Sequence, residues 1–387
     1  MKGARKAVRD SEMTSRERLL AALRGQEVDR LPWSPFLTYW WDAQSEERQK
    51  RGQIEYCREI GADALLRGAN STVACSDVLG LREVPLGEFY NYTDDLPGCT
   101  IRRTTNGKYK FVSFETPIGK LSMTLTHSPA GNTWFVTEHQ IRSKEDYKTL
   151  QYMVEHMKID ACYDPVKKQL EELGENGLTV PVVSPFLKTP FQSFVEHFVG
   201  IEKLVYDLND FPETVEETLA VMSEKARMAV KVAAGSMAEI FISWEDSSTT
   251  SVSPKLFSKY IVPELNAWGK ILHDAKKMLV HHACGHVREL LPLMALENID
   301  AVESISPPPT GNLEIWDAQK IIGGRMALIG GIEPVKLASY EGDAFDDYIR
   351  EILQKMDRRS YILANSDSCP PSVSEEKFQR IGRMVRE

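Results

Sequence analysis

The fold is decided by residues 239–283, which read EIFISWEDSSTTSVSPKLFSKYIVPELNAWGKILHDAKKMLVHHA. Two apolar runs, Glu239–Ser243 and Met278–Ala283, flank the segment Pro254–Asp274, in which apolar residues recur at helical spacing. Runs rich in Val, Ile and Leu are typical of strands that are buried on both faces. The stretch therefore predicts a strand, a helix and a second strand that lies parallel to the first.

The same alternation extends over most of the 387 residues. Eight apolar runs recur: Pro32–Leu37, Ala62–Leu66, Leu178–Val183, Glu239–Ser243, Met278–Ala283, Ile299–Glu303, Met326–Ile329 and Tyr361–Ala364. Helical patterns lie between them, among others Ser45–Ile60, Pro212–Ala234, Val287–Leu296, Asp343–Met356 and Ser374–Val385. Eight such units predict an α/β fold closed into a (β/α)8 TIM barrel. A doubly wound open sheet competes, but no G-x-G-x-x-G follows the first run.

Two segments stand outside the alternation. Residues 15–25, SRERLLAALRG, follow Thr14 and predict an N-terminal helix that ends at Gly25. From about 84 to 138 the chain is rich in Thr, Tyr, Phe and Gly, and Asn106-Gly107 separates two β-prone runs as in a hairpin. This predicts an antiparallel insertion after the second strand, placed where it can cover the barrel mouth. Because no linker is visible, residues 1–387 are expected to form one domain.

Composition excludes several classes of function. Hydrophobic residues make up 42% and charged residues 27%, which is typical of a chain that buries a large core. The net charge of −9 disfavours binding to nucleic acid or to anionic membranes. No apolar segment suits a membrane span or a signal peptide, and six scattered cysteines do not form a secreted disulfide framework. We expect a cytoplasmic protein, monomeric or homodimeric, with reduced cysteines.

Several strand ends carry side chains suited to a metal. His282 and Cys284 lie two residues apart at the end of the fifth run, so their side chains face the same side. Cys369 follows the eighth run, and in a barrel both runs end on the same rim. These three would leave a tetrahedral zinc site with one open position, although core packing is the alternative for each cysteine. Glu245 and Asp246 follow the fourth run and could supply a base or a fourth ligand, or merely cap a loop.

A substrate site is expected beside these groups. The predicted substrate-binding residues are Tyr39, Trp40, Glu303, Gly331 and Asn365. Glu303 could accept a hydrogen bond at the end of the sixth run, and Gly331 permits close approach of the backbone after the seventh. Tyr39 and Trp40 either line an aromatic pocket or pack beneath the first loop.

Six segments together resemble the uroporphyrinogen decarboxylase superfamily over nearly the whole chain. They are RERLLAALRGQEVDRLPW, TPIGKLSMTL, WEDSSTTSVSPKLFSKYIVPELNAW, HHACGHVREL, PPPTGNLEIWDAQKIIGGRMALIGGIEPVKL and the loop around Cys369. The superfamily is built on the same barrel and contains porphyrinogen decarboxylases and corrinoid-dependent methyltransferases, such as the methylcobalamin:coenzyme M methyltransferases. The resemblance to the zinc methyltransferases, which use H-x-C and a distant Cys, implies that His282, Cys284 and Cys369 are the ligands.

One departure separates the branches of this superfamily. The decarboxylases carry an arginine-rich segment after the opening helix that holds the substrate carboxylates, whereas residues 30–44 here read RLPWSPFLTYWWDAQ. A polyanionic tetrapyrrole would leave carboxylates unpaired in such a site, which is costly. The resemblance therefore implies a zinc-dependent methyltransferase that moves a methyl group between a corrinoid and a small molecule, first of all from methylcobalamin to a zinc-activated thiol.

The corrinoid is expected on a partner protein. The chain lacks D-x-H-x-x-G, the motif of domains that ligate cobalamin through histidine, so a corrinoid protein would dock at the barrel rim. Three alternatives stay open. The chain could be the first methyltransferase of a demethylase system, taking methyl from a methoxyaromatic or a methylamine onto cob(I)alamin. It could be a porphyrinogen decarboxylase, or a non-catalytic scaffold with a structural zinc site of four protein ligands.

Overall fold

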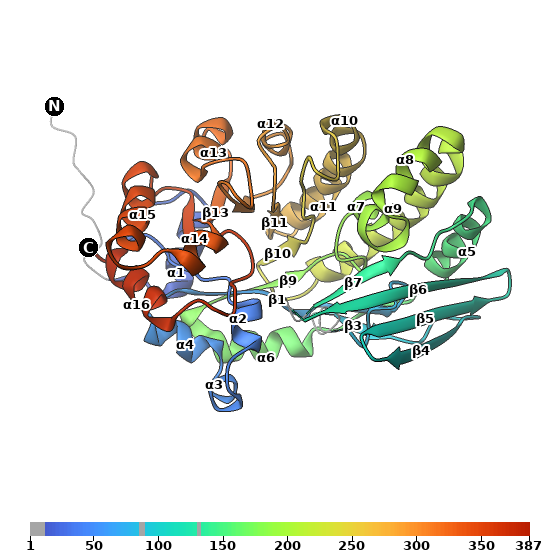
Figure 1. Cartoon of the computed structure of the whole chain (residues 1–387), viewed down its shortest axis with the longest axis horizontal. Helices are drawn as coiled ribbons and strands as arrows, with labels where there is room; N and C mark the ends of the chain where they lie inside the picture. Colours follow the sequence, from blue (N-terminus) through green and yellow to red (C-terminus); the bar gives the residue numbers. More distant parts are fainter. Residues whose placement is uncertain (1–11, 85–89, 130–132) are drawn as a thin grey trace.

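The computed structural model describes residues 12–84, 90–129 and 133–387. The predicted insertion at about 84–138 includes residues 85–89 and 130–132, which lie outside that description, as does the segment 1–11. The chain folds into a TIM-like α/β structure with an antiparallel sheet at one side (Figure 1). Within the described ranges, no helix combines the length and the apolar character that crossing a bilayer requires.

Seven strands form one parallel sheet in the order β1-β9-β10-β11-β12-β13-β14. Their bounds are β1 (Ala64–Ser71), β9 (Gly177–Val182), β10 (Ile240–Ser243), β11 (Met278–His282), β12 (Ala301–Ile305), β13 (Ala327–Ile332) and β14 (Tyr361–Asn365). Every residue of β9 to β14 is buried, because helices and the interior cover the two faces. Seven of the eight predicted apolar runs are thus strands of this sheet.

The first predicted run joins the two edges of the sheet. It contributes one parallel bridge, between Trp33 and Leu363 of β14. The amide of Ser34 donates to the carbonyl of Leu363 at 2.9 Å, and on the other side the amide of Asp63 donates to the carbonyl of Trp33 at 2.7 Å. Hydrogen bonds therefore run from β14 through this segment to the start of β1, and the carboxyl ends of the strands meet at one rim.

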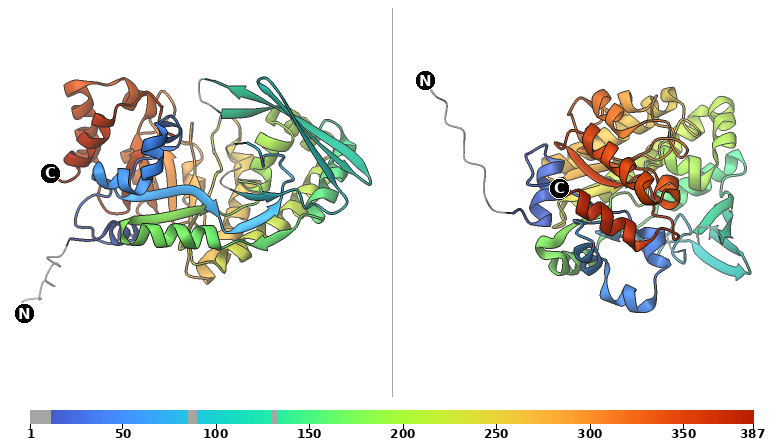
Figure 2. Two further views of the ribbon diagram at one scale, coloured as in Figure 1. Left: turned by 90° about the horizontal axis from the view of Figure 1, so that it is seen from below. Right: turned by 60° about the vertical axis from the view of Figure 1, so that its left-hand side comes forward.

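Helices cover the outer face of the sheet (Figure 2). Besides α5 (Lys144–Glu155), the longer helices of the described chain are α1 (Ser15–Leu23), α4 (Gln53–Glu59), α6 (Asp164–Leu173), α8 (Ile201–Asp210), α9 (Pro212–Ala234), α11 (Val262–Asp274), α13 (Ile315–Ile322), α15 (Gly342–Lys355) and α16 (Glu375–Met384). Short helices lie in the connections: α2 (Thr38–Asp42), α3 (Glu46–Arg51), α7 (Pro190–Ser193), α10 (Pro254–Leu256), α12 (Leu291–Met294) and α14 (Pro334–Ser339). The predicted helix Ser45–Ile60 is broken between α3 and α4 at Gly52, whose φ of 85° interrupts the helical path.

The segment between β1 and α5, together with β8 (Ile159–Ala161) just after α5, forms two further sheets. A small sheet has the order β3-β2-β8, with β2 (Val73–Ser76) and β3 (Asn91–Thr93). An antiparallel sheet has the order β4-β5-β6-β7, with β4 (Thr100–Asn106), β5 (Tyr109–Thr116), β6 (Gly119–Ser128) and β7 (Thr133–Glu138). Gly107, with φ of 58°, permits the tight turn between β4 and β5.

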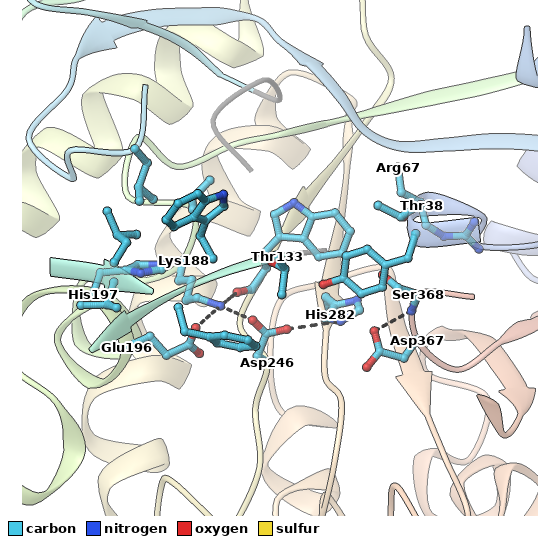
Figure 3. Close-up of a pocket in the computed structure, with 18 of the residues that line it drawn as sticks. Thr38, Arg67, Thr133, Lys188, Glu196, His197, Asp246, His282, Asp367 and Ser368 are labelled. Carbon is cyan, nitrogen blue, oxygen red and sulfur yellow. Dashed lines mark hydrogen bonds and ion pairs between the residues drawn. The ribbon is translucent and has the colours of Figure 1, made fainter. Parts of the chain in front are cut away.

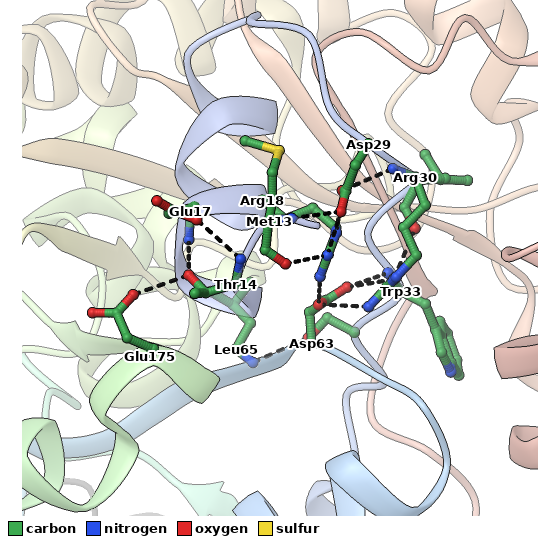
Figure 4. A network of polar contacts seen from close by, with 12 residues as sticks. Met13, Thr14, Glu17, Arg18, Asp29, Arg30, Trp33, Asp63, Leu65 and Glu175 are labelled. Carbon is green, nitrogen blue, oxygen red and sulfur yellow. Dashed lines mark hydrogen bonds and ion pairs between the residues drawn. The ribbon is translucent and has the colours of Figure 1, made fainter. Parts of the chain in front are cut away.

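A buried ion-pair network fixes α1 beneath the strands (Figure 4). The guanidinium of Arg18, which is 2% exposed, lies 2.6 Å from Asp29 Oδ1 and 2.6 Å from Asp63 Oδ1. Arg30 pairs with the other oxygen of Asp63 at 2.8 Å. Since Asp63 precedes β1, the network ties α1 and the segment at Trp33 to the amino end of the sheet, opposite the rim that carries the site.

Candidate metal centre

Three donor side chains meet at the carboxyl ends of adjacent strands. Asp246 lies three residues after β10, His282 ends β11, and Cys284 lies two residues further. One ligand atom of each lies within 4.8 Å of the others. Asp246 Oδ1 is 3.3 Å from His282 Nε2 and 3.4 Å from Cys284 Sγ. We call Asp246, His282 and Cys284 the donor triad.

Side chains of β12 and β1 fix the position of His282 on the side away from Asp246. Its Nδ1 lies 3.3 Å from Glu303 Oε2 and 3.3 Å from Ser304 Oγ, both on β12. Arg67 of β1 forms a buried ion pair with Glu303. Burial opposes the charge on His282, but Glu303 and Asp246 outweigh burial, so the pKa of His282 is raised. A carboxylate on Nδ1 favours the tautomer whose Nε2 is available to a metal.

Asp246 is held in a similar way by a buried lysine. Lys188 Nζ contacts Asp246 Oδ2 and lies 2.7 Å from the carbonyl oxygen of Trp244 and 2.8 Å from Glu196 Oε2. Because Lys188 takes Oδ2, Oδ1 stays directed at His282 and Cys284. Burial raises the pKa of Asp246, but Lys188 and His282 outweigh burial, and the pKa is lowered. The carboxylate is therefore charged and oriented for a cation.

The donor triad borders a cavity of about 340 Å³ (Figure 3). His282 and Asp246 belong to its wall. Five aromatic side chains complete much of that wall: Phe36, Tyr39, Trp134, Phe135 and Trp244. The ring of Trp244 stacks on Phe36 with centroids 5.6 Å apart and meets His282 edge-on at 4.7 Å. Since Trp134 and Phe135 lie on β7, the antiparallel sheet supplies part of the wall.

A second cavity, of about 310 Å³, lies on the Cys284 side of the triad. Its wall is rich in hydroxyl groups, those of Ser248, Thr250, Ser251, Ser306, Thr310 and Ser366. Asp246 and Asp367 line both cavities, whereas His282 lines the aromatic cavity and Cys284 the hydroxyl-lined one. The triad thus lies between two spaces of contrasting chemistry.

Two polar residues at the other end of the aromatic cavity, Glu196 and His197, were not predicted from the sequence. Figure 3 places Glu196 and His197 on the side of Lys188 away from His282. Both residues belong to the π-helical turn η3 (Phe194–Phe198). Burial raises the pKa of Glu196 to about 7, and burial together with the charge of Lys188 lowers that of His197 to about 3. No motif marks these residues, and the one available signal was a lysine in the loop after an apolar run.

The two adjacent carboxylates predicted after β10 have different surroundings. Glu245 is fully buried and does not line the aromatic cavity. Its Oε1 accepts from the amide of Thr189 at 2.7 Å, its Oε2 accepts from the Thr189 hydroxyl at 2.8 Å, and Ser243 also donates to it. Glu245 therefore joins the loops that follow β9 and β10, and Asp246 alone of the pair reaches the cavity.

Cys369 lies outside the donor triad. Its side chain is fully buried, its amide donates to the carbonyl of Phe36 at 2.9 Å, and its Sγ lies 3.7 Å from the carbonyl oxygen of Pro370. Burial raises the pKa of its thiol. From the same loop, Asp367 and Ser368 line the aromatic cavity instead. The structure brings His282 and Cys284 together, but it does not bring Cys369 to them.

The two predicted aromatic residues, Tyr39 and Trp40, also differ in whether they reach the cavity. Tyr39 lines the cavity, and burial raises the pKa of its phenol. Trp40 does not: its ring packs 5.0 Å from that of Tyr56 and 5.2 Å from that of Phe378, and its Nε1 donates to the carbonyl of Val373 at 2.8 Å. For Trp40, packing beneath the first loop is the interpretation that the geometry favours.

Two other predicted substrate-binding residues support the rim without lining the cavity. The side-chain amide of Asn365 makes two hydrogen bonds to the backbone of Phe36: Oδ1 accepts from the Phe36 amide at 2.9 Å, and Nδ2 donates to the Phe36 carbonyl at 2.9 Å. These bonds hold the first segment against β14. Gly331 has φ of 102°, and its amide donates to Ser366 Oγ at 2.8 Å. A Cβ at Gly331 would lie 2.7 Å from the hydroxyl of Tyr361, so the position requires glycine for packing.

The donor triad fits a zinc ion in chemistry and number. Imidazole nitrogen, cysteine sulfur and carboxylate oxygen are the donors that zinc binds, and three protein ligands leave the open position of a catalytic site. Burial and the carboxylates of Asp246 and Asp367 raise the pKa of Cys284 well above its ordinary value. A bound cation would reverse this effect, because a coordinated thiol loses its proton.

The fold and the triad define the class: a TIM-like α/β protein with a candidate metal centre at the carboxyl rim of its strands. The model of the uroporphyrinogen decarboxylase (URO-D) family matches residues 116–387. The chain therefore belongs to the URO-D family. No curated protein matches the sequence.

Two solved structures are similar to this chain at low sequence identity. A methyltransferase from Methanosarcina mazei is 16% identical with a TM-score of 0.61, over 97% of this chain and 98% of that one. A B12-independent methionine synthase from Shewanella sp. W3-18-1 is 13% identical with a TM-score of 0.46, over 92% of this chain and 98% of that one. The first similarity supports a common fold with the methyltransferase.

Proposed function

We propose that the chain is a zinc-dependent methyltransferase that moves a methyl group between a corrinoid on a partner protein and a small organic molecule. The observation that carries the proposal is the convergence of Asp246, His282 and Cys284 at the edge of the aromatic cavity. Membership of the URO-D family and the shared fold with a methyltransferase support it.

Each residue of the site has a defined part in this proposal. Asp246, His282 and Cys284 hold the metal, while Lys188 and Glu303 orient two of these ligands from behind. When bound, zinc supplies a Lewis acid that keeps a thiol deprotonated or polarises a leaving group. The aromatic walls exclude water and hold the organic molecule against the metal end of the cavity.

The charges of the cavity argue against a porphyrinogen decarboxylase. Among the described residues that line the aromatic cavity, the arginine and lysine side chains are Arg67 and Lys188. Arg67 is paired with Glu303, and Lys188 with Asp246 and Glu196. A substrate with several carboxylates would find no unpaired cation in this wall, and burying its charges there would be costly.

The direction of methyl transfer has two candidates. Transfer from methylcobalamin to a zinc-activated thiol follows from the chemistry of zinc and sulfur. The aromatic wall favours the reverse direction, in which a methoxyaromatic or methylamine donor occupies the cavity and its methyl passes to cob(I)alamin. In both cases the corrinoid would approach the rim on its own protein, next to β7.

Gel filtration and cross-linking with corrinoid proteins test that docking, and absence of both complex and turnover would contradict it.

Cys369 stays a proposed further ligand, beside which Asp246 would be the fourth ligand of the resting site that the small molecule replaces. Its Sγ would have to leave its contact with Pro370, and its loop would have to release the hydrogen bond between the Cys369 amide and Phe36. Metal content of the wild type, Cys284→Ser and Cys369→Ser tests both assignments. We expect about one zinc per chain in the wild type and depletion in both variants. Equal zinc in all three proteins would remove the metal site and with it the proposed function, whereas retention in Cys369→Ser alone would leave the donor triad.

A methyl-transfer assay completes the test. Loss of methyl from methylcobalamin in the presence of assorted thiols, and methylation of cob(I)alamin by methoxyaromatics or methylamines, separate the two directions. Turnover that disappears in Cys284→Ser would support the proposal. Turnover that is unaffected by removal of the metal would contradict it.

A further inference from the structure

A histidine with an unpartnered, buried ring nitrogen lines the aromatic cavity at the end away from the donor triad. His197 lines the cavity, yet its Nε2 is buried and makes no hydrogen bond within the described part of the chain. A buried polar atom without a partner costs free energy, and native structures rarely contain one without a use. Figure 3 places His197 at one side of the cavity and His282 at the other, with Lys188 and Asp246 between them.

The backbone presents His197 to the cavity through an unusual turn. Phe194–Phe198 is π-helical, and such single turns recur at functional sites because they redirect one or two side chains. Glu196 in the same turn is engaged: its carboxylate meets Lys188 at 2.8 Å and Gln192 Nε2 at 2.8 Å. His197 is thus the member of the turn with hydrogen-bonding capacity left over.

Apart from Asp367, the charged groups of the wall form ion pairs. Lys188 has three acceptors, Trp244, Asp246 and Glu196, so its three N–H bonds are engaged. The guanidinium of Arg67 is buried against Glu303 and backbone carbonyls. An anionic ligand therefore finds no free cation in the described wall, and a cationic ligand meets carboxylates that Lys188 already holds.

Asp367 is the remaining acidic residue of the wall, and it does not place a charge at the end of the cavity where His197 lies. Asp367 accepts from the amide of Ser368 at 2.6 Å and lies beside His282, at the metal end of the cavity. The end at His197 offers a hydrogen-bonding ring, and aromatic side chains line the cavity between it and the metal end. Such a wall suits a flat, uncharged molecule, because stacking and one hydrogen bond are the interactions it offers.

We propose that His197 is a specificity-determining residue, which binds the hydroxyl or carbonyl group of a flat, uncharged aromatic substrate whose other end faces the donor triad. The proposal rests on the proposed function for its role in methyl transfer, but the binding itself can be measured without turnover. It selects an aromatic ether over a methylammonium ion as the class of molecule that the cavity takes.

Binding of simple probes to the zinc-loaded full chain tests the proposal. The probes are 2-, 3- and 4-methoxyphenol, which have a ring and a hydroxyl, methoxybenzene, which lacks the hydroxyl, and tetramethylammonium, which has charge and no ring. Titration calorimetry and quenching of tryptophan fluorescence report binding, since Trp134 and Trp244 line the cavity. The variants are His197→Leu, His197→Gln, which keeps a hydrogen-bonding group, and the exposed control His156→Leu.

We expect at least one methoxyphenol to bind about tenfold more tightly than methoxybenzene. His197→Leu should remove that preference and leave methoxybenzene unchanged, His197→Gln should restore part of it, and His156→Leu should have no effect. Three results would overturn the proposal: no preference in the wild type, equal loss for both kinds of probe in His197→Leu, or tightest binding by tetramethylammonium. Zinc content, measured on the same samples, separates this failure from failure of the proposed metal site.

Discussion

The carboxylate behind His282 offers the sharpest single-residue prediction. Glu303 lies 3.3 Å from His282 Nδ1 and pairs with buried Arg67. In Glu303→Gln the charge is lost while the shape is kept, so the tautomer and orientation of His282 are no longer fixed by an anion. Loss of such a supporting group lowers metal affinity by about 10- to 100-fold. At about 1.4 kcal/mol per decade, this corresponds to about 1.4–2.8 kcal/mol of zinc binding.

Competition with a chromophoric chelator measures the zinc affinity of folded Glu303→Gln. Circular dichroism checks that the variant is folded, because Arg67 loses its charged partner as well. Glu333→Gln is the matched control, since Glu333 is equally buried beside the end of β13 and instead caps α14 through the amide of Lys336. The reasoning is refuted if zinc affinity is unchanged in Glu303→Gln, or if Glu333→Gln lowers it as much.

Three further substitutions test other contacts. Lys188→Met should lower zinc affinity by about 10- to 100-fold, because Asp246 is no longer held by the lysine. In an Asp246→Asn background the same substitution should have no effect on zinc affinity. An equal effect in that background would show that Lys188 does not act through Asp246. Asp63→Ala should lower the free energy of unfolding by about 3–5 kcal/mol in urea, because buried Arg18 loses one of its two carboxylate partners and Arg30 loses the same one; a loss below about 1 kcal/mol would contradict this. Gly331→Ala should destabilise the fold by about 1–3 kcal/mol through contact with the Tyr361 hydroxyl, and an unchanged melting temperature would argue against that strain.

The strands of the parallel sheet could be predicted from sequence because their apolar runs are long enough to be buried on both faces. The run at Pro32–Leu37 is the exception: it contributes one bridge at Trp33, since Pro32 and Pro35 lack amide hydrogens for a regular ladder. The predicted helix Val287–Leu296 is shortened to α12, Leu291–Met294. The propensities of single residues do not determine which residues of the first run pair with β14, or where α12 begins and ends.

The candidate site was predictable only where local spacing determines it. His282 and Cys284 share a face because they lie two residues apart at a strand end. Lys188 and His197 come from a loop and a π-helical turn, for which the sequence carries no periodic signal. Cys369 belongs to a loop whose path depends on a backbone contact with Phe36, and such long-range contacts are not encoded in spacing.

X-ray absorption at the zinc edge tests the donor triad most directly. Zinc-loaded wild type is predicted to have a sulfur shell at about 2.3 Å beside nitrogen and oxygen at about 2.0–2.2 Å. Cys284→Ser should lose one sulfur from that shell. A spectrum with nitrogen and oxygen neighbours alone, or a sulfur shell that is identical in the wild type and Cys284→Ser, would contradict the account.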